Sequence, residues 1–415
     1  MVTSTACFKE AKMKELESWK KHGVYETVKN IVARGFEESH LNFQKDSPTC
    51  SSESIKIILA VLAQKAWAPK SIDIKTAFLQ GHKLHREVFI KPPKEADASL
   101  QWYKRVRDCM LTLGASISKL DPAVFYWTDE EKEVQGVLAV HVDDFLFGGT
   151  VEFEKKVMSN VRKEFLIGKE EISSFRYTGM NISHVSGVEN EIRFDQNFYA
   201  SNLAQIFVTK ERVLQKDSLL TDSEKSMVRA KVGQLLWIGR QSRLDLLFDT
   251  CDLASRIKDG TVKELLETNK VIRRAKSEKL TLRYEKLNDP SLLVYSDASL
   301  GNMKNGGTQG AYFIGLQGQE GFSPICWSSR KVRRVVRSTL AGETLAMADA
   351  KDSGIYVASL YSELICGKYD SKCIKIICLT DCKSLYEAVK SQKSVTEKRL
   401  RIEISGLKEG LELEW

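Results

Sequence analysis

The sequence contains no run of about 18 apolar residues, which is the length that a helix needs to cross a bilayer. Its first twelve residues, Met1 to Lys12, also lack the apolar core of a secretory signal. We therefore expect neither a membrane-spanning segment nor secretion, and no membrane partner.

Paired cysteines with the CxxC spacing of zinc sites are missing as well. We expect all nine cysteines to be reduced thiols of an intracellular protein rather than zinc ligands. Only six histidines are present, and the closely spaced pair His82 and His85 has no acidic third ligand nearby. We interpret these two as solvated loop residues.

The composition is that of an ordinary folded protein. The chain has 415 residues, of which 42% are hydrophobic and 28% charged, so it should form two to three domains with real cores. A net charge of +8 suits a polyanionic partner. Many enzymes are equally basic, so charge alone does not identify that partner.

Two adjacent aspartates lie between short apolar runs in the stretch from Gly136 to Gly149, GVLAVHVDDFLFGG. Its valines, phenylalanines and closing glycines predict a β-hairpin with Asp143 and Asp144 at or beside the tip. Carboxylates held this close repel each other, and a divalent cation commonly relieves that repulsion. A solvated Asp-Asp turn is the alternative.

A third carboxylate supports the metal interpretation. Asp73 lies in the stretch SIDIKTAFLQG, residues 71–81, where Ile72 and Ile74 predict the end of a strand. A strand-end aspartate facing an aspartate pair is the arrangement of a two-metal phosphoryl-transfer site, whose ions lie about 3.5–4 Å apart.

Both stretches resemble the polymerase motifs of copia-type LTR-retrotransposon reverse transcriptases, D-x-K-T-A-F-L-x-G and Y-V-D-D. The resemblance implies that Asp73, Asp143 and Asp144 bind two Mg²⁺ ions, with Mn²⁺ as a substitute. It implies that Phe78 lies under the incoming sugar and discriminates against a 2′-OH. His141 replaces the usual tyrosine. The implied partners are an RNA template, a DNA primer and dNTPs.

Two blocks of the family pattern are absent from this chain. The family has a β-rich fingers segment before K-A-R-x-V-A-R-G-F, whereas here residues 23–30 run directly into IVARGF. The loop and helix over the nascent base pair are missing between Ser99 and Leu100. Arg34 is predicted to contact a phosphate, with a solvated loop arginine as the alternative.

A new pattern begins after Asn288-Asp289-Pro290, the clearest predicted domain boundary. It predicts strands over 291–299, 310–317 and 324–329, a helix from Ser338, a strand over 374–381 and a further helix. Asp297 and Asp381 lie at strand ends, and Glu343 lies at the helix start. Each position alone favours acids for structural reasons, so the prediction of a site depends on all three.

This order resembles the ribonuclease H fold, which implies that Asp297, Glu343 and Asp381 bind two metal ions and that an RNA–DNA hybrid is bound. Ala341 replaces the first of two family glutamates, and the family's fourth aspartate is absent before Trp415, which predicts a weakened second ion. A basic run before the helix predicts nucleic-acid contacts, with a solvated loop as the alternative. It comprises Arg330, Lys331, Arg333, Arg334 and Arg337.

We therefore expect a multidomain protein of α/β and α+β class. Residues 1–165 should form reduced fingers and a split βαβ palm, residues 166–288 a helical thumb and connection region, and residues 289–415 a ribonuclease H-like mixed sheet that is truncated at its C-terminus. Helices are expected over 8–22, 51–67 and 262–278, and a hairpin near 175–194.

Two functional interpretations remain. The first is an RNA-directed DNA polymerase with a ribonuclease H domain, which acts in a cytoplasmic particle of the element and in the nucleus. The second is a decayed remnant that at most binds nucleic acid, supported by the two missing blocks and the missing aspartate. Against decay, the six other metal ligands are intact.

Overall fold

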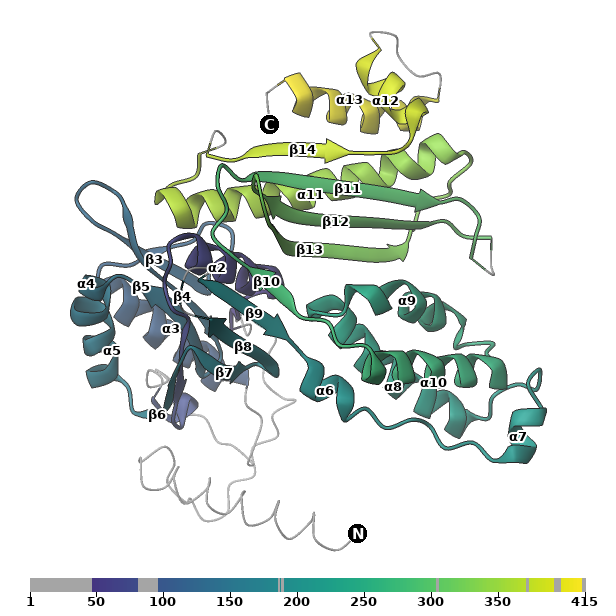
Figure 1. The fold of residues 1–415 in the computed structure, drawn as a ribbon, viewed down its shortest axis with the longest axis horizontal. Helices are drawn as coiled ribbons and strands as arrows, with labels where there is room; N and C mark the ends of the chain where they lie inside the picture. The colour runs from purple at the N-terminus through teal and green to yellow at the C-terminus, as the bar shows by residue number, and fades with distance from the viewer. Residues whose placement is uncertain are drawn as a thin grey trace, which may run out of the picture.

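The structure is a computed structural model (Figure 1) that describes most of the chain beyond residue 46. The described residues are 47–80, 96–185, 187, 190–303, 306–370, 373–391 and 397–412. The predictions for the helix over 8–22, for Arg34, and for His82 and His85 lie outside these ranges, as does the side chain of Phe78.

Helix α2 (Ser52–Gln64) begins where the sequence predicts, because the side chain of Ser51 accepts the backbone N–H of Ser54. Its apolar residues suggest one buried stripe, but the structure buries every residue from Ser54 to Ala63. The helix packs against β4 (Val134–His141) of one sheet and β13 (Phe322–Lys331) of another. It is therefore a central element of the fold.

The first sheet is antiparallel, with strand order β2-β3-β4-β5-β1-β6. Its other strands are β1 (Lys70–Ile74), β2 (Ser116–Ile117), β3 (Val124–Thr128), β5 (Asp144–Gly149) and β6 (Ile167–Ile172), and its helices are α3 (Ala96–Thr112), α4 (Val151–Phe153) and α5 (Ser159–Glu164). The predicted hairpin is present as β4 and β5. Strand β6 lies beyond residue 165, where the sequence places the end of the first domain.

Glycines let the ring of Phe153 pack against this hairpin. A Cβ atom added at Gly136 or at Gly149 would lie 2.4 Å from that ring. Since such a contact is far inside van der Waals distance, these two positions have room for glycine only unless the ring moves.

A smaller sheet and a group of helices follow. The sheet has the order β10-β9-β8-β7 and comprises β7 (Ser174–Tyr177), β8 (Met180–Val185), β9 (Glu191–Asp195) and β10 (Leu282–Tyr284). The helices are α6 (Asn197–Ser201), α7 (Lys210–Leu214), α8 (Asp222–Gln241), α9 (Leu247–Arg256) and α10 (Val262–Ser277). The hairpin near 175–194 and the helix over 262–278 are thus as predicted.

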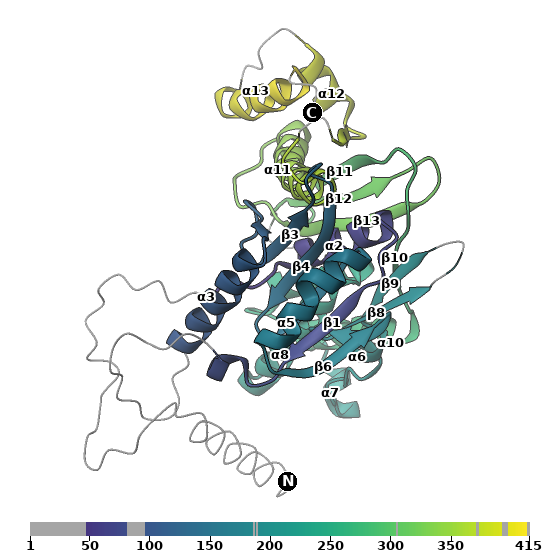
Figure 2. The ribbon, with the colours of Figure 1, turned by 90° about the vertical axis from the view of Figure 1, so that its left-hand side faces the viewer.

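The C-terminal sheet has the order β13-β12-β11-β14, in which β14 (Lys375–Leu379) runs parallel to β11 (Ser291–Ser299). Between them come β12 (Gln309–Gln317), β13 and the long helix α11 (Thr339–Cys366), which packs on β11 and β12. Helices α12 (Lys383–Lys390) and α13 (Lys398–Glu412) lie beside α11 (Figure 2). The predicted order of three strands, helix, strand and helix is present.

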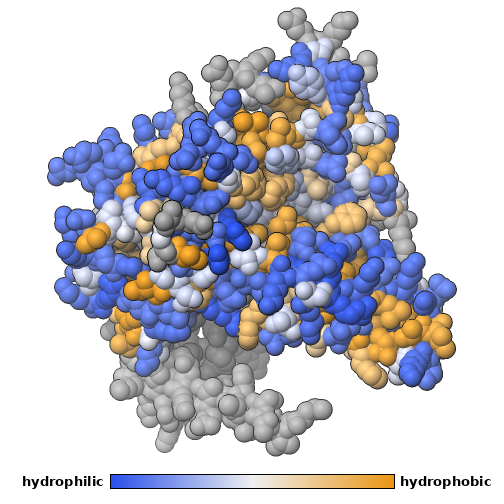
Figure 3. Space-filling view, in the orientation of Figure 1, coloured by the Kyte–Doolittle hydropathy of each residue, from blue (hydrophilic) through white to orange (hydrophobic). Residues whose placement is uncertain are grey.

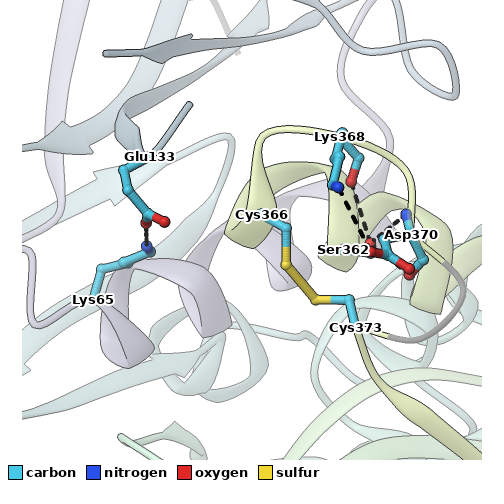
Figure 4. Close-up of a disulfide and its surroundings, with 7 residues drawn as sticks. All are labelled: Lys65, Glu133, Ser362, Cys366, Lys368, Asp370 and Cys373. Atoms are coloured by element: carbon cyan, nitrogen blue, oxygen red, sulfur yellow. Dashed lines mark hydrogen bonds and ion pairs between the residues drawn. A yellow bond between two sulfur atoms is a disulfide. The ribbon is translucent and has the colours of Figure 1, made fainter. Parts of the chain in front are cut away.

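One expectation about the cysteines is wrong. Cys366 and Cys373 form a disulfide that joins the end of α11 to the segment before β14 (Figure 4). The chain reverses direction here, and Ser362 holds the turn by donating to the carbonyls of Lys368 and Asp370. The reversal brings together two cysteines that are seven residues apart in sequence. The other cysteines in the described ranges are free thiols.

The surface is mostly polar, with apolar areas that include two on the face shown in Figure 3. One lies over the C-terminal sheet and the other at the end of the molecule where Figure 1 labels α7. Phe207 and Leu214, near and within α7, are the most exposed large apolar side chains described. None of the helices in the described ranges is both long and apolar enough to span a membrane.

Candidate active sites

Three acidic side chains from distant parts of the sequence meet at one end of the C-terminal sheet. Asp297 lies near the end of β11, and Asp381 follows β14. Because these neighbouring strands are parallel, with Tyr295 opposite Leu379, their carboxyl ends lie side by side. Glu343 comes from the N-terminal part of α11, which packs on β11. One ligand oxygen from each residue lies within 4.8 Å of the other two.

The environment of Glu343 disfavours its ionised form. Its side chain is only 4% exposed, and this burial, together with the nearby charges of Asp297 and Asp381, raises its pKa to about 7. The backbone N–H of Ala298 donates to Oε1 at 3.3 Å and partly opposes that rise. The other oxygen, Oε2, is buried and has no hydrogen-bond partner.

This donor set fits a divalent cation. Three carboxylate oxygens are hard ligands of the kind that Mg²⁺ and Mn²⁺ prefer, and the buried Oε2 of Glu343 would gain the partner that it lacks. An open hollow lies beside the cluster and is lined by Tyr295, Tyr312, Phe313 and Thr380 as well as the two aspartates. The cluster can therefore be reached from solvent.

The basic run is exposed and only partly committed to ion pairs. Arg330 pairs with Asp349 at 2.8 Å, and Arg334 pairs with Glu403 of α13. Lys331, Arg333 and Arg337 make no ion pair within the described part of the chain. Of the run, Lys331, Arg333 and Arg337 are thus the cations best placed to meet an external anion.

A second acidic group lies on the first sheet. Asp73 of β1 pairs in register with Asp144 of β5, so their side chains point to the same face. The row continues to His141 of β4 on one side and Lys169 of β6 on the other. Asp143 lies in the β4–β5 turn, and its carbonyl accepts the N–H of Ile74 at 2.9 Å.

The charges in this row affect one another. Burial raises the pKa of Asp144 to about 6, with further contributions from Asp143 and Asp73. Burial also raises the pKa of Asp73, and Asp143 adds to that rise while Lys169 opposes it. On β6, a Cβ atom at Gly168 would lie 2.3 Å from Asp73 Oδ2, so the glycine leaves room for this carboxylate.

The turn that carries Asp143 is strained and held from outside. Val142 has a φ of 59°, a left-handed conformation that is costly for a β-branched residue. Its carbonyl accepts the indole N–H of Trp102 of α3 at 2.7 Å. Trp102 is buried and packs edge-on against Phe165. Helix α3 therefore fixes the tip of the hairpin.

The two acidic groups differ in how closely their oxygens meet. Among the described residues, Asp297, Glu343 and Asp381 form the only group of three whose ligand atoms all lie within 4.8 Å of one another. Asp73, Asp143 and Asp144 are not such a group, although Asp73 and Asp144 face each other on neighbouring strands.

Sequence reasoning missed Lys169 and Trp102 as neighbours of the first group. The position of Lys169 depends on the pairing of β6 with β1, which joins residues far apart in sequence and has no local signal. Trp102 lies on α3, forty residues before Val142 in the sequence, so its contact with Val142 depends on the tertiary fold. Only its size and single donor mark it as a residue that needs a buried partner.

Comparison with known proteins gives relatives of one kind, although no family model matches the chain. Over 367 residues the chain is 25% identical to the retrovirus-related Pol polyprotein from transposon RE1 of Arabidopsis thaliana. It is 23% identical, over 376 residues, to that from transposon TNT 1-94 of Nicotiana tabacum. Both alignments cover 80% of this chain but only 24% and 28% of those polyproteins, so the chain spans about a quarter of their length.

The fold is similar to a solved structure, foamy viral protease-reverse transcriptase in complex with dsDNA. The TM-score is 0.54 at 12% sequence identity, and the match covers 96% of this chain and 80% of that one. The mixed α/β architecture therefore resembles that of a viral reverse transcriptase structure.

Proposed function

Because the homologues of this chain are retrovirus-related Pol polyproteins from plant transposons, we propose that it is the part of such a polyprotein that joins an RNA-directed DNA polymerase to a ribonuclease H. The proposal includes membership of the copia type. The observation that carries it is the cluster of Asp297, Glu343 and Asp381, a donor set for divalent cations beside an open hollow.

The proposed domain boundaries are those that the sequence predicts. Residues 1–165 are the palm with reduced fingers, residues 166–288 the thumb and connection region, and residues 289–415 the ribonuclease H domain. Strand β6, which completes the first sheet, would extend the palm to Ile172.

At the ribonuclease H site, Asp297, Glu343 and Asp381 would hold the metal ions. Bound Mg²⁺ or Mn²⁺ supplies Lewis acidity, which lowers the pKa of the attacking oxygen and stabilises the leaving one. The exposed aspartates would face the scissile phosphate, and the buried Glu343 would fix the cluster to α11. Lys331, Arg333 and Arg337 would contact backbone phosphates of an RNA–DNA hybrid, whose 2′-OH groups and groove shape identify the RNA strand.

At the polymerase site, Asp73, Asp143 and Asp144 would hold the second pair of ions near the primer 3′-OH and the dNTP phosphates. Phe78 would exclude a ribose 2′-OH, and Arg34 would contact a phosphate. Lys331 and the rest of the basic run lie on the proposed ribonuclease H domain. At the polymerase site itself, other residues would contact the template and the primer.

A remnant that binds nucleic acid without polymerase activity is the second candidate. It is favoured by the wider spacing of the acids on the first sheet, together with the two blocks that this chain lacks relative to the family. It predicts binding that weakens with salt and no incorporation of nucleotides.

The ribonuclease prediction is tested by cleavage of the RNA strand of an RNA–DNA hybrid with Mg²⁺ or Mn²⁺. We expect wild-type protein and Asp352→Asn to cut, because Asp352 is an exposed acid of α11 outside the cluster. We expect Asp297→Asn to lose the activity. Equal cleavage by wild type and Asp297→Asn would show that the activity belongs to a contaminant.

The polymerase prediction is tested by primer extension on poly(rA)–oligo(dT). Incorporation that disappears in Asp143→Asn but persists in Asp297→Asn supports a polymerase site on the first sheet. Wild-type signal at the level of Asp143→Asn, with hybrid binding retained, selects the remnant instead.

A further inference from the structure

A lysine is buried where three parts of the molecule meet. Lys56 lies in the middle of α2, is 1% exposed, and takes part in neither acidic group. An ammonium that is removed from water is costly unless it is paired or hydrogen-bonded. Its partners therefore indicate why a charge is kept at this position.

Each partner of Lys56 belongs to a different part of the fold. Its Nζ lies 3.8 Å from the ring centroid of Trp327 on β13, a cation–π contact, and donates to the carbonyl of Arg240 at the end of α8 at 3.3 Å. The indole N–H of Trp327 donates to the carbonyl of the adjacent Gly239 at 2.8 Å. The three contacts form a closed triangle between α2, α8 and β13.

The charge of Lys56 is maintained at a cost. Burial lowers its pKa to about 8, and the neighbouring Glu53 opposes that shift. An apolar residue would fill the same space without this cost. An ammonium adds a geometric constraint that an apolar side chain lacks, because its Nζ must lie close to both the Arg240 carbonyl oxygen and the face of the Trp327 ring.

Other polar contacts join α2 and the first sheet to the same neighbours. Ser52 Oγ of α2 donates to Gln241 Oε1 at the end of α8 at 2.5 Å. Ser54 of α2 lies 3.2 Å from the Tyr356 hydroxyl, and Glu363 accepts bonds from Ser118 Oγ at 2.5 Å and from the Lys119 N–H at 3.2 Å. Because α11 packs on β11 and β12, and β12 pairs with β13, these bonds also help to place the C-terminal sheet. The joint at Lys56 links all three parts.

We propose that Lys56 is a positioning residue that fixes the C-terminal sheet and the end of α8 relative to the first sheet. It thereby sets the separation between the Asp73–Asp144 row and the Asp297–Glu343–Asp381 cluster. The consequence for catalysis rests on the proposed function: a hybrid bound across both sites would be cut at a set distance from the primer 3′ end.

The structural part of this proposal is tested without activity. Two exposed residues, Glu152 of α4 and Glu320 of the β12–β13 turn, are each replaced by a noncanonical amino acid that carries a spin label. Pulsed EPR then measures the distance between the two labels. Lys56→Met keeps the volume and removes the charge, and we expect it to lose the single sharp distance of the wild type.

Lys65→Met is the matched control, since Lys65 caps the same helix and pairs with Glu133 within the first part of the fold (Figure 4). It should keep the wild-type distance. Trp327→Phe keeps most of the packing and loses the bond to Gly239, so it should broaden the distance even if Lys56→Met fails to fold. A wild-type distance in both variants overturns the proposal.

The catalytic consequence is read from the lengths of RNA cut from a hybrid with a recessed primer. We expect a narrow set of lengths from wild type and Lys65→Met and a wider set from Lys56→Met. If the wild type does not cut at all, the proposed function fails while the EPR measurement still tests Lys56. Unchanged lengths together with a broadened distance would overturn the link to cleavage.

Discussion

Glu343 is the residue whose protonation matters most to the C-terminal cluster. Its pKa of about 7 in the fold lies above the ordinary value of 4.5. As pH rises from about 4.5 to 7, the unfolded chain releases this proton while the folded chain retains it. The group therefore lowers the free energy of unfolding progressively across this window, and the full loss is present above it.

Glu343→Gln removes that penalty in protein freed of cations by chelation. We expect this variant to be more stable than wild type at pH 8 by about 1 kcal/mol, because the open side of the cluster screens the acids. At pH 4.5 the difference should vanish. Thermal melts at both pH values measure it, with Asp352→Asn as an exposed acid on the same helix. A gain that is the same at both pH values would contradict ionisation as its cause.

Local signals identified the acids but not their neighbours. Strand ends and a helix start are visible in sequence, which is why Asp297, Glu343 and Asp381 could be proposed before the fold was known. Lys56 lies inside an apolar helix, and the sequence gives no prediction for it because its partners Trp327 and Arg240 lie far away in the chain.

The hairpin that carries Asp143 depends on helix α3. Trp102→Phe keeps an aromatic ring in the core but removes the bond to the Val142 carbonyl, leaving that oxygen without its donor. We expect a loss of about 1 kcal/mol in urea unfolding and reduced primer extension, with hybrid cleavage unchanged.

Trp127→Phe is the control for that variant. Trp127 is also buried on the first sheet and donates to a carbonyl, that of Leu113 at 3.0 Å, away from the hairpin tip. It should cost similar stability and leave extension unchanged. Equal effects of the two variants on extension would mean that stability alone, and not the tip geometry, is involved.

The same hairpin is intolerant of a methyl group. Gly136→Ala places a Cβ 2.4 Å from the ring of Phe153, so we expect it to destabilise the protein by about 1–3 kcal/mol. Gly233→Ala in α8, where a Cβ would have no neighbour within 4 Å, should instead stabilise by roughly 0.5–1 kcal/mol. Urea unfolding compares the two, and a stable Gly136→Ala would show that the ring moves aside freely.

Elements with strong local patterns were predictable, whereas their pairing was not. The helix that begins after Ser51 and the β4–β5 hairpin follow from a cap residue and from apolar runs around a turn. The pairing of β10 with β9 and of β6 with β1 joins segments separated by long stretches of chain. The disulfide has a different origin: its cysteines are only seven residues apart, but the sequence does not show the reversal after α11 that brings them together.

At the scale of the whole molecule, the two acidic groups belong to sheets that are joined through α2 and α11. Buried polar contacts at Lys56, Ser54 and Glu363 cross between them. The fold therefore presents both groups in one body. Whether each holds a cation is the claim on which the proposed function depends.

Titration with Mn²⁺, followed by EPR of the free ion, measures this most directly because it needs no turnover. We expect Asp297→Asn to lower the Mn²⁺ affinity of one class of site by on the order of 10- to 100-fold, and Asp352→Asn to bind Mn²⁺ as the wild type does. Equal Mn²⁺ binding by wild type and Asp297→Asn would contradict the account.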